Sequence, residues 1–437
     1  MNSVLLRAKN YVKSIFHNNF IKSIIMISSG TAFAQVVGML ASPIITRIYP
    51  PDQYGMLTLF NSVLAVVGLV GSLKYELTIP IVEDDTDAIN SLSLSFFILF
   101  FFSIVTTAIL LIFKESILRL IGAERLLNYW YLIPIGILLT QTYRILTQFA
   151  YRNKDFKSIT TTMGIQSLVG NVLKIITGSL GFGVIGLLSS KILSESLGAT
   201  TLAKPLYTTK DLRDKISIKR MKWIAKRYIK FPLYQFPSTL VGQFSVNIPV
   251  FFLGFLYNSQ VVGAFGLANT IVRLPMNLIG RSVSNVFFAE AASIGNSNPD
   301  RLKSLSDKLF IRLIFIGLLP LLALLLFGPF MFSFVFGDSW VEAGNFARIL
   351  SILVFAEFIF SPVSRVFEIY EKQQQILNLN IVKVVLSTVA FGVAHFLSLS
   401  QYMTVFLYTI AMSIAYALTY ILAQKYINEA INKKNEL

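Results

Sequence analysis

Long apolar runs recur along the whole chain and constrain its fold more than any other feature. A hydrocarbon core of about 30 Å takes roughly 20 apolar residues in helical form, and backbone groups in lipid must be paired within the protein. Runs of about this length stand at 24–46, 55–73, 88–112, 129–150, 159–180, 183–202, 232–256, 261–288, 310–335, 346–368, 376–397 and 402–424. The sequence therefore predicts an all-α integral membrane protein of about twelve transmembrane helices.

Composition excludes several classes of protein. Of the 437 residues 54% are hydrophobic and 14% charged, so little chain remains for a soluble domain. The chain has no cysteine and two histidines, which excludes thiolate metal sites and cysteine nucleophiles and argues against a histidine metal site. It also lacks a P-loop, an HExxH motif and a GxSxG elbow. We expect no enzyme, no metal and no cofactor.

Positive charge lies between the apolar runs, which indicates membrane topology rather than nucleic-acid binding. The net charge is +16, and ten Lys and Arg residues lie in 203–231 alone. An even number of spans puts both termini on one side. If that side is the cytoplasm, nearly all positive residues of the connecting segments fall inside, as the positive-inside rule requires. We expect a membrane protein with cytoplasmic termini and no nucleic-acid partner.

The basic central segment divides the spans into two groups of six. The expected parts are a basic amphipathic arm at 1–22, a six-helix lobe at 23–202, a connecting loop at 203–231, a second lobe at 232–424 and a tail at 425–437. Within the loop, apolar residues recur at helical spacing beside lysines and arginines, at Met221, Ile224, Ala225 and Tyr228. This pattern predicts a helix lying on anionic lipid headgroups. Two six-helix halves are typical of transporters built from parallel repeats.

Ionisable side chains inside the spans are mostly positive, and their cost in hydrocarbon places them in the bundle interior. Those without an opposite charge one turn away are Arg144, Lys174, Arg273 and Arg281, with Lys383 a weaker case. Amides lie on the same helical stripes, at Gln35, Gln243, Asn269 and Asn277. Guanidinium pairs with phosphate oxygens in bidentate fashion, and amides suit sugar hydroxyls. We predict these nine residues as binding candidates for an anionic guest such as a pyrophosphate; a structural role carries equal weight.

Other charges and prolines have simpler interpretations. Lys191 with Glu195 and Arg365 with Glu368 stand one helical turn apart, which predicts internal ion pairs. Prolines interrupt several spans, at Pro43, Pro134, Pro237, Pro249, Pro275, Pro320 and Pro362. Each removes a helix hydrogen bond and permits a kink. Bends in the first and seventh spans serve either as gates for alternating access or as ordinary kinks.

Six stretches of the chain are distinctive as whole segments: SGTAFAQVVGMLASPIITRIYPPDQYGMLTLF (29–60), LKYELTIPIVEDDTDAINSL (73–92), FPLYQFPSTL (231–240), VGAFGLANTIVRLPMNLIGRSVSNVFFAEAA (262–292), FGDSWVEAG (336–344) and SPVSRVFEIYEKQQ (361–374). They resemble the polysaccharide flippases of the Wzx type, within the multidrug/oligosaccharidyl-lipid/polysaccharide exporter superfamily, whose members lie in the bacterial inner membrane. The resemblance spans nearly the full chain in order. It departs from the family at Lys74, where an arginine is usual.

The resemblance implies two six-helix lobes around a central cavity. It also implies movement of undecaprenyl-pyrophosphate-linked oligosaccharide, a repeat of O-antigen, capsule or exopolysaccharide, from the cytoplasmic to the periplasmic leaflet. Expected partners are this lipid-linked substrate, membrane lipids, and the polysaccharide polymerase and chain-length machinery. A proton or sodium gradient is the candidate motive force, with Glu357 the candidate coupling residue. A drug or cation antiporter of the same superfamily is the alternative, and an embedded glycosyltransferase or polymerase is a third.

Overall fold

The computed structural model describes residues 19–208, 215–294 and 298–435. Within these ranges a few side chains, those of Asn277 and Arg281 among them, are not described. Most of the predicted amphipathic arm, residues 1–18, lies outside the described residues, and the first helix, α2, runs from Asn19 to Ile48. Every described element is helical, and each predicted span meets a helix. The all-α prediction is therefore confirmed.

Eight of the described helical segments are long and apolar enough to cross a membrane. The other predicted spans are shorter or carry polar stripes. α7 (Gly183–Ser196) has 14 residues, about 21 Å of helix at 1.5 Å per residue. It ends before Gly198, whose φ of +90° favours glycine. α8 (Ala199–Thr208) then continues into the segment predicted as a loop. A count of twelve spans remains a prediction.

The described chain forms two compact units that are not continuous in sequence. Unit 1 comprises residues 1–48, 67–112 and 129–237, and unit 2 comprises 49–66, 113–128 and 238–437. The lobe boundaries 23–202 and 232–424 stay a prediction.

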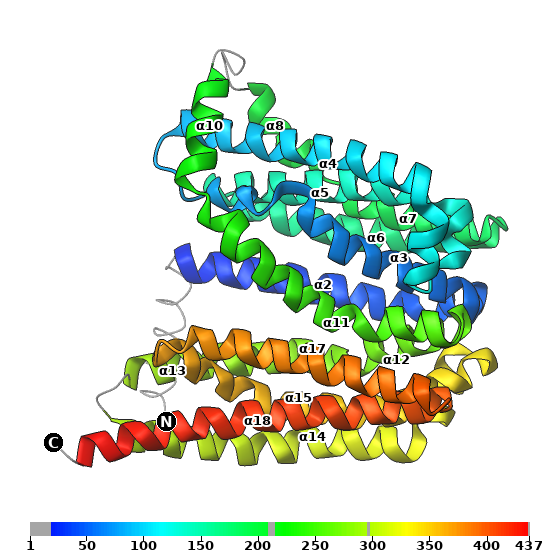
Figure 1. Cartoon of the computed structure of the whole chain (residues 1–437), viewed down its shortest axis with the longest axis vertical. Helices are drawn as coiled ribbons and strands as arrows, with labels where there is room; N and C mark the ends of the chain where they lie inside the picture. The colour runs from blue at the N-terminus through cyan, green and yellow to red at the C-terminus, as the bar shows by residue number, and fades with distance from the viewer. Residues whose placement is uncertain (1–18, 209–214, 295–297, 436–437) are drawn as a thin grey trace, which may run out of the picture. The chain divides into compact units, whose positions relative to one another are not determined.

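In unit 1, α2 packs along α6 (Phe156–Ser179), and α6 packs on α7 (Figure 1). α5 (Leu132–Arg152) packs on α7 and α8. Most of α4 (Asp85–Leu120) also belongs to this unit. It is preceded by two short 3₁₀ turns, Gly68–Ser72 and Tyr75–Thr78. The described residues of unit 1 thus form helices and short helical turns, with no strand among them.

The connecting helix α10 (Ile218–Arg227) is docked on unit 1 by its apolar face. Ile224 is fully buried and packs with Tyr75 and Leu94. The Tyr75 hydroxyl donates a 2.9 Å hydrogen bond to the carbonyl of Ala225. Protein side chains thus cover Ile224, while Ile218, Trp223 and the lysines and arginines of α10 are exposed. That α10 lies on anionic headgroups stays a prediction.

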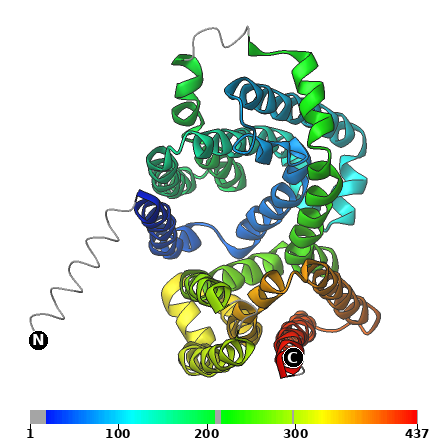
Figure 2. The same ribbon diagram turned by 90° about the vertical axis from the view of Figure 1, so that its left-hand side faces the viewer.

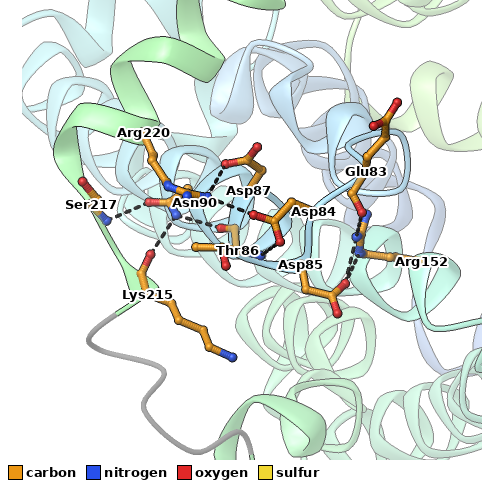
Figure 3. Close-up of polar contacts among 10 residues, drawn as sticks. All are labelled: Glu83, Asp84, Asp85, Thr86, Asp87, Asn90, Arg152, Lys215, Ser217 and Arg220. Atoms are coloured by element: carbon orange, nitrogen blue, oxygen red, sulfur yellow. Dashed lines mark hydrogen bonds and ion pairs between the residues drawn. The ribbon is translucent and has the colours of Figure 1, made fainter.

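Ion pairs and an amide clamp join α10 to the start of α4 (Figure 3). Arg220 pairs with Asp84 and with Asp87, each at 3.0 Å. The Asn90 side chain accepts a 2.8 Å hydrogen bond from the Ser217 amide and donates one of 2.8 Å to the carbonyl of Lys215. The hydrogen bond from the Thr86 amide, and next the one from Arg220, lower the pKa of Asp84. A hydrogen-bonded carboxylate favours its charged form, so this contact is strongest when Asp84 is ionised.

Unit 2 contains α11 (Phe236–Leu256), α12 (Ser259–Pro275), α13 (Arg281–Ile294), α14 (Pro299–Phe336), α15 (Val341–Phe360), α17 (Gln373–Phe396) and α18 (Gln401–Asn435). α15 lies at the centre, packed against α12, α14 and α18, while α17 packs on α18. Several of these yellow-to-red helices are seen nearly end on in Figure 2.

α3 (Pro51–Val67) belongs to unit 2 although it follows α2 directly in sequence. It crosses α12 where Gly55 faces Ser259 and Gly263. A Cβ added at Gly55 would lie 1.7 Å from the carbonyl oxygen of Ser259. Close backbone approach of this kind is typical of small residues between membrane helices. Tyr54, on the same helix, meets the fully buried Trp340 edge to face, with ring centroids 5.4 Å apart.

Two helices of unit 2 change their winding at prolines. After Pro275, α12 passes through a π-helical turn, Met276–Gly280, before α13 begins. At Pro362, α15 passes through a 3₁₀ turn, Ser361–Arg365, into the short α16 (Val366–Ile369). A proline removes one helix hydrogen bond, and such turns re-pair the backbone around the gap. The ion pairs Arg273–Glu357 and Arg365–Glu368 of unit 2 lie next to these two turns.

Candidate functional site

Arg273 and Glu357 form the charged centre of unit 2. Arg273 lies on the last turn of α12, just before the π-helical turn, and its guanidinium is paired with the carboxylate of Glu357 on α15. The Nε group of Arg273 donates a 2.8 Å hydrogen bond to the Asn269 side chain one turn earlier. The side chains of Arg273 and Glu357 are 26% and 18% exposed. Asn269 thus fixes the guanidinium while Glu357 neutralises it.

Tyr416 connects this pair to a second cation. Its hydroxyl, on α18, lies near enough to Glu357 for the two groups to interact. The ammonium of Lys383, on α17, lies over the Tyr416 ring, 4.3 Å from its centroid. A cation over an aromatic face is attracted by the ring quadrupole. Within the described part of the chain no carboxylate lies within ion-pair distance of Lys383. The cluster therefore holds two cations and one carboxylate.

A cavity of about 140 Å³ reaches this cluster from the side of the 3₁₀ turn. A single water needs only about 10–15 Å³ of such space, so the cavity is large enough for several waters or a small polar group. Its walls include Lys383 and Tyr416, the pair Arg365 and Glu368, and the amide of Asn380. Arg365 and Glu368 are 2.6 Å apart. Lys383 thus borders a polar space inside the helix bundle.

Unit 1 holds a separate cluster that is also rich in positive charge. Lys191 and Glu195, both on α7, form an ion pair of 2.7 Å. Lys174 on α6 and Arg144 on α5 lie near enough for their charges to act on Glu195. Gln166 donates hydrogen bonds of 3.0 and 2.7 Å to the carbonyls of Glu195 and Leu197, which holds the end of α7 against α6. Three cations thus act on one carboxylate here, with Lys191 paired to it, Lys174 half-buried and Arg144 exposed.

The remaining predicted site residues are dispersed. Gln35 on α2 has a buried side-chain oxygen without a hydrogen-bond partner among the described residues. Gln243 lies half-buried on α11, where its carbonyl accepts a hydrogen bond from Asn247. The side chains of Asn277 and Arg281 lie outside the described part of the structure. Lys74, the departure from the family pattern, lies 3.6 Å from Glu76.

Sequence spacing found some of these contacts and missed others. The two predicted ion pairs, Lys191 with Glu195 and Arg365 with Glu368, are confirmed. The partner of Arg273 was missed because Glu357 is 84 positions away and on another helix. Glu357 was predicted only as a residue for ion coupling, and the cation–π contact of Lys383 with the Tyr416 ring was not predicted. The signal that could have found the pair is one unpaired charge of each sign in neighbouring apolar spans.

The sequence family described as polysaccharide biosynthesis protein matches residues 44–345 of the chain. The chain belongs to this family. Two proteins of similar sequence support this assignment. An uncharacterized membrane protein in the cps region of Klebsiella pneumoniae is 21% identical to this chain over 361 residues, which cover 80% of this chain and 71% of that protein. The succinoglycan biosynthesis transport protein ExoT of Rhizobium meliloti (strain 1021) is 19% identical over 327 residues, covering 74% of this chain and 63% of that protein.

Solved structures of MOP-superfamily transporters and of a lipid flippase are similar in fold to this polysaccharide biosynthesis protein. An inward-facing multidrug resistance MATE transporter of that superfamily gives a TM-score of 0.75 at 19% identity, covering 91% of this chain and 96% of that one. The lipid II flippase MurJ, in an inward closed conformation, gives 0.71 at 15% identity, covering 92% and 87%. The expected family and the all-α membrane fold class are thus confirmed, and the protein is a multi-pass membrane protein whose fold is similar to that of these two structures.

Proposed function

We propose that this protein is a flippase for oligosaccharide linked to undecaprenyl pyrophosphate, moving the unit from the cytoplasmic to the periplasmic leaflet by alternating access. The observation that carries the proposal is the excess of positive charge inside both units of a polysaccharide biosynthesis protein. In unit 1 three cations act on one carboxylate, and in unit 2 two cations share one. Charges are costly inside a membrane protein and are retained where a ligand needs them.

The passenger fits the chemistry of these clusters. A pyrophosphate carries several negative oxygens, and a guanidinium such as that of Arg273 binds them through paired hydrogen bonds. The amides of Asn269, Gln35 and Gln243 are suited to sugar hydroxyls. The lipid tail needs no protein site, since it remains in the bilayer. Nothing in this scheme requires a covalent step, so the protein acts as a carrier and not as an enzyme.

The rest of the proposal follows from charge and topology. Both termini and the basic helix α10 face the cytoplasm, because the positive-inside rule favours that side for lysine-rich segments. The protein lies in the bacterial inner membrane, with two six-helix lobes. It receives its passenger where the lipid-linked unit is made and delivers it to the polymerase and chain-length machinery. A proton or sodium gradient supplies the driving force. Asn277 and Arg281 stay predicted contributors.

The alternative is export of drugs or other organic cations, which the MATE likeness of the fold also allows. A cation carrier needs unbalanced carboxylates in its interior, because a positive guest is attracted by negative charge. In the described residues the carboxylates inside the bundle, Glu195, Glu357 and Glu368, are each paired with a cation. The balance of interior charge therefore favours the anionic passenger.

Replacement of Arg273 in cells that depend on this gene for surface polysaccharide tests the proposal. We expect Arg273→Ala to abolish surface polysaccharide and Arg273→Lys to restore part of it, since lysine keeps the charge but loses the bidentate geometry. Arg301→Ala is the matched control, because Arg301 is an exposed arginine of the same unit, paired with Glu290 at 3.1 Å. Membrane abundance is measured for each variant. Full polysaccharide from Arg273→Ala at normal abundance would refute the role of this arginine.

A further inference from the structure

We propose that Glu357 is a built-in counter-anion, which holds Arg273 while the carrier is empty and turns to Lys383 and Tyr416 when a phosphate group takes Arg273. The inference rests on the proposed function, because it assigns a role to the groups around the proposed phosphate contact. It makes Glu357 a competitor of the passenger. Glu357 is a positioning residue here and does not itself touch the passenger.

The first step of the argument is the state of Arg273 without a ligand. Its guanidinium is held by Asn269 at 2.8 Å and is paired with Glu357. The pair is largely shielded from solvent, and a lone charge in such surroundings is strongly unfavourable. A carrier that returns empty exposes its phosphate-binding cation to that cost on every cycle. Glu357 removes the cost by neutralising Arg273 on the return.

The second step is the position of Glu357 once a phosphate binds Arg273. Its carboxylate lies beside Tyr416, and the ammonium of Lys383 lies 4.3 Å from the centroid of the Tyr416 ring. The charges of Glu357 and Lys383 already act on one another. Lys383 has no carboxylate of its own within ion-pair distance in the described residues. It is therefore the cation to which Glu357 can turn without leaving the cluster.

The third step is the space that this exchange needs. The cavity of about 140 Å³ borders both Lys383 and Tyr416. Lys383 and Tyr416 stand at its wall, so they have room to adjust when Glu357 turns to them, and water can enter to hydrate the ammonium. The pair Arg365 and Glu368, 2.6 Å apart, stands at the same cavity but is not in contact with Arg273. Glu368 thus provides a carboxylate of the same unit that plays no part in the exchange.

Titration of the purified full chain with inorganic pyrophosphate, by calorimetry in lipid nanodiscs, tests the competition. Glu357→Gln removes the competing charge, so pyrophosphate should bind about tenfold more tightly than to the unchanged protein. Glu368→Gln is the matched control and should change the affinity by less than about twofold. Unchanged or weaker binding by a folded Glu357→Gln variant would overturn the proposal. A merely structural role for Glu357 would weaken binding, not strengthen it.

If Glu357→Gln does not fold, the same titration with Glu357→Asp tests the proposal. The shorter carboxylate reaches Arg273 less well, so the affinity for pyrophosphate should still rise, by less than with Gln. No rise with Asp would overturn the proposal.

Lys383→Met separates an indirect role of Lys383 from direct contact with phosphate. Without Lys383, Glu357 has lost its second partner and competes harder for Arg273, so Lys383→Met should weaken pyrophosphate binding. In the Glu357→Gln background the same change should have no effect, since the competitor is already gone. Weakening by the same factor in both backgrounds would show direct contact, because independent contributions add in free energy. That result would overturn the partner exchange.

Flipping in reconstituted vesicles keeps this inference distinct from the proposed function. Glu357→Gln should load one passenger but turn over slowly, because its empty form returns with Arg273 unpaired. If the unchanged protein flips the substrate but Glu357→Gln binds pyrophosphate no more tightly, the counter-anion role of Glu357 is refuted and the proposed flippase function is not. If the unchanged protein does not flip the substrate, the proposed flippase function is refuted, while the pyrophosphate titration still decides the role of Glu357.

Discussion

Truncation of Ile224 should release the connecting helix α10 from unit 1 without unfolding the protein. Ile224 is 0% exposed and packs with Tyr75 and Leu94. Truncating a buried isoleucine to alanine costs about 2–5 kcal/mol, and the low end applies where the site can collapse. Since α10 lies at an edge of the unit, we expect about 2 kcal/mol, which corresponds to a roughly 30-fold shift in the docking equilibrium.

Hydrogen exchange of the backbone amides of α10, measured by mass spectrometry on the folded protein, reports this equilibrium directly. Ile224→Ala should speed exchange in 218–227 by about 30-fold and leave α12 and α15 unchanged. Ile218→Ala makes the same chemical change on the same helix, but Ile218 is 72% exposed, so exchange should change little. Equal effects of the two substitutions, or none from Ile224→Ala, would refute the reasoning that burial of Ile224 docks this helix.

Three further predictions concern α10, the crossing of α3 with α12, and topology. The contact between Arg220 and Asp84 depends on ionised Asp84, whose folded pKa is lowered, so its contribution is present at neutral pH and lost in acid. The protection of the α10 amides, taken relative to the intrinsic exchange rate at each pH, should therefore fall below about pH 4 and stay flat there in Arg220→Ala. Gly55→Ala puts a Cβ 1.7 Å from the Ser259 carbonyl oxygen, and overpacking of this kind costs about 1–3 kcal/mol or more. The melting temperature of the protein in detergent should therefore fall clearly, and an unchanged melting temperature would contradict the close crossing of α3 and α12. Because the chain has no cysteine, a single cysteine at the exposed Asn428 should react with an impermeant maleimide only from the cytoplasmic side, and labelling from the periplasm would reverse the proposed orientation.

The helical membrane fold follows from the sequence because an apolar run of about 20 residues can cross the hydrocarbon core with its backbone hydrogen bonds satisfied only as a helix. Local charge pairs were predictable for the same reason, since Lys191 and Glu195 stand one turn apart on a helix whose geometry is known. The grouping of α3 with unit 2 was not predictable in this way. It depends on Gly55 and Gly263 meeting across helices that are far apart in sequence, and a glycine in an apolar run carries no sign of its partner.

The candidate site was predictable in its residue types but not in its pairing. Helical spacing put Arg273 and Asn269 on one stripe, and the structure joins them by a hydrogen bond. It could not show that Glu357 lies opposite, because the crossing of α12 and α15 sets that contact. For α10 the spacing identified the apolar face, but it could not show that Ile224 packs with Tyr75 and Leu94. Burial against protein and burial in headgroups demand the same amphipathic pattern.

Movement of a labelled lipid-linked oligosaccharide across reconstituted vesicles tests the central claim most directly. Vesicles that contain the purified protein should expose the labelled sugar to an external, impermeant probe far faster than protein-free vesicles do, and an organic cation should not be transported. Transport of the organic cation, with the lipid-linked sugar left at the protein-free rate, would contradict the account.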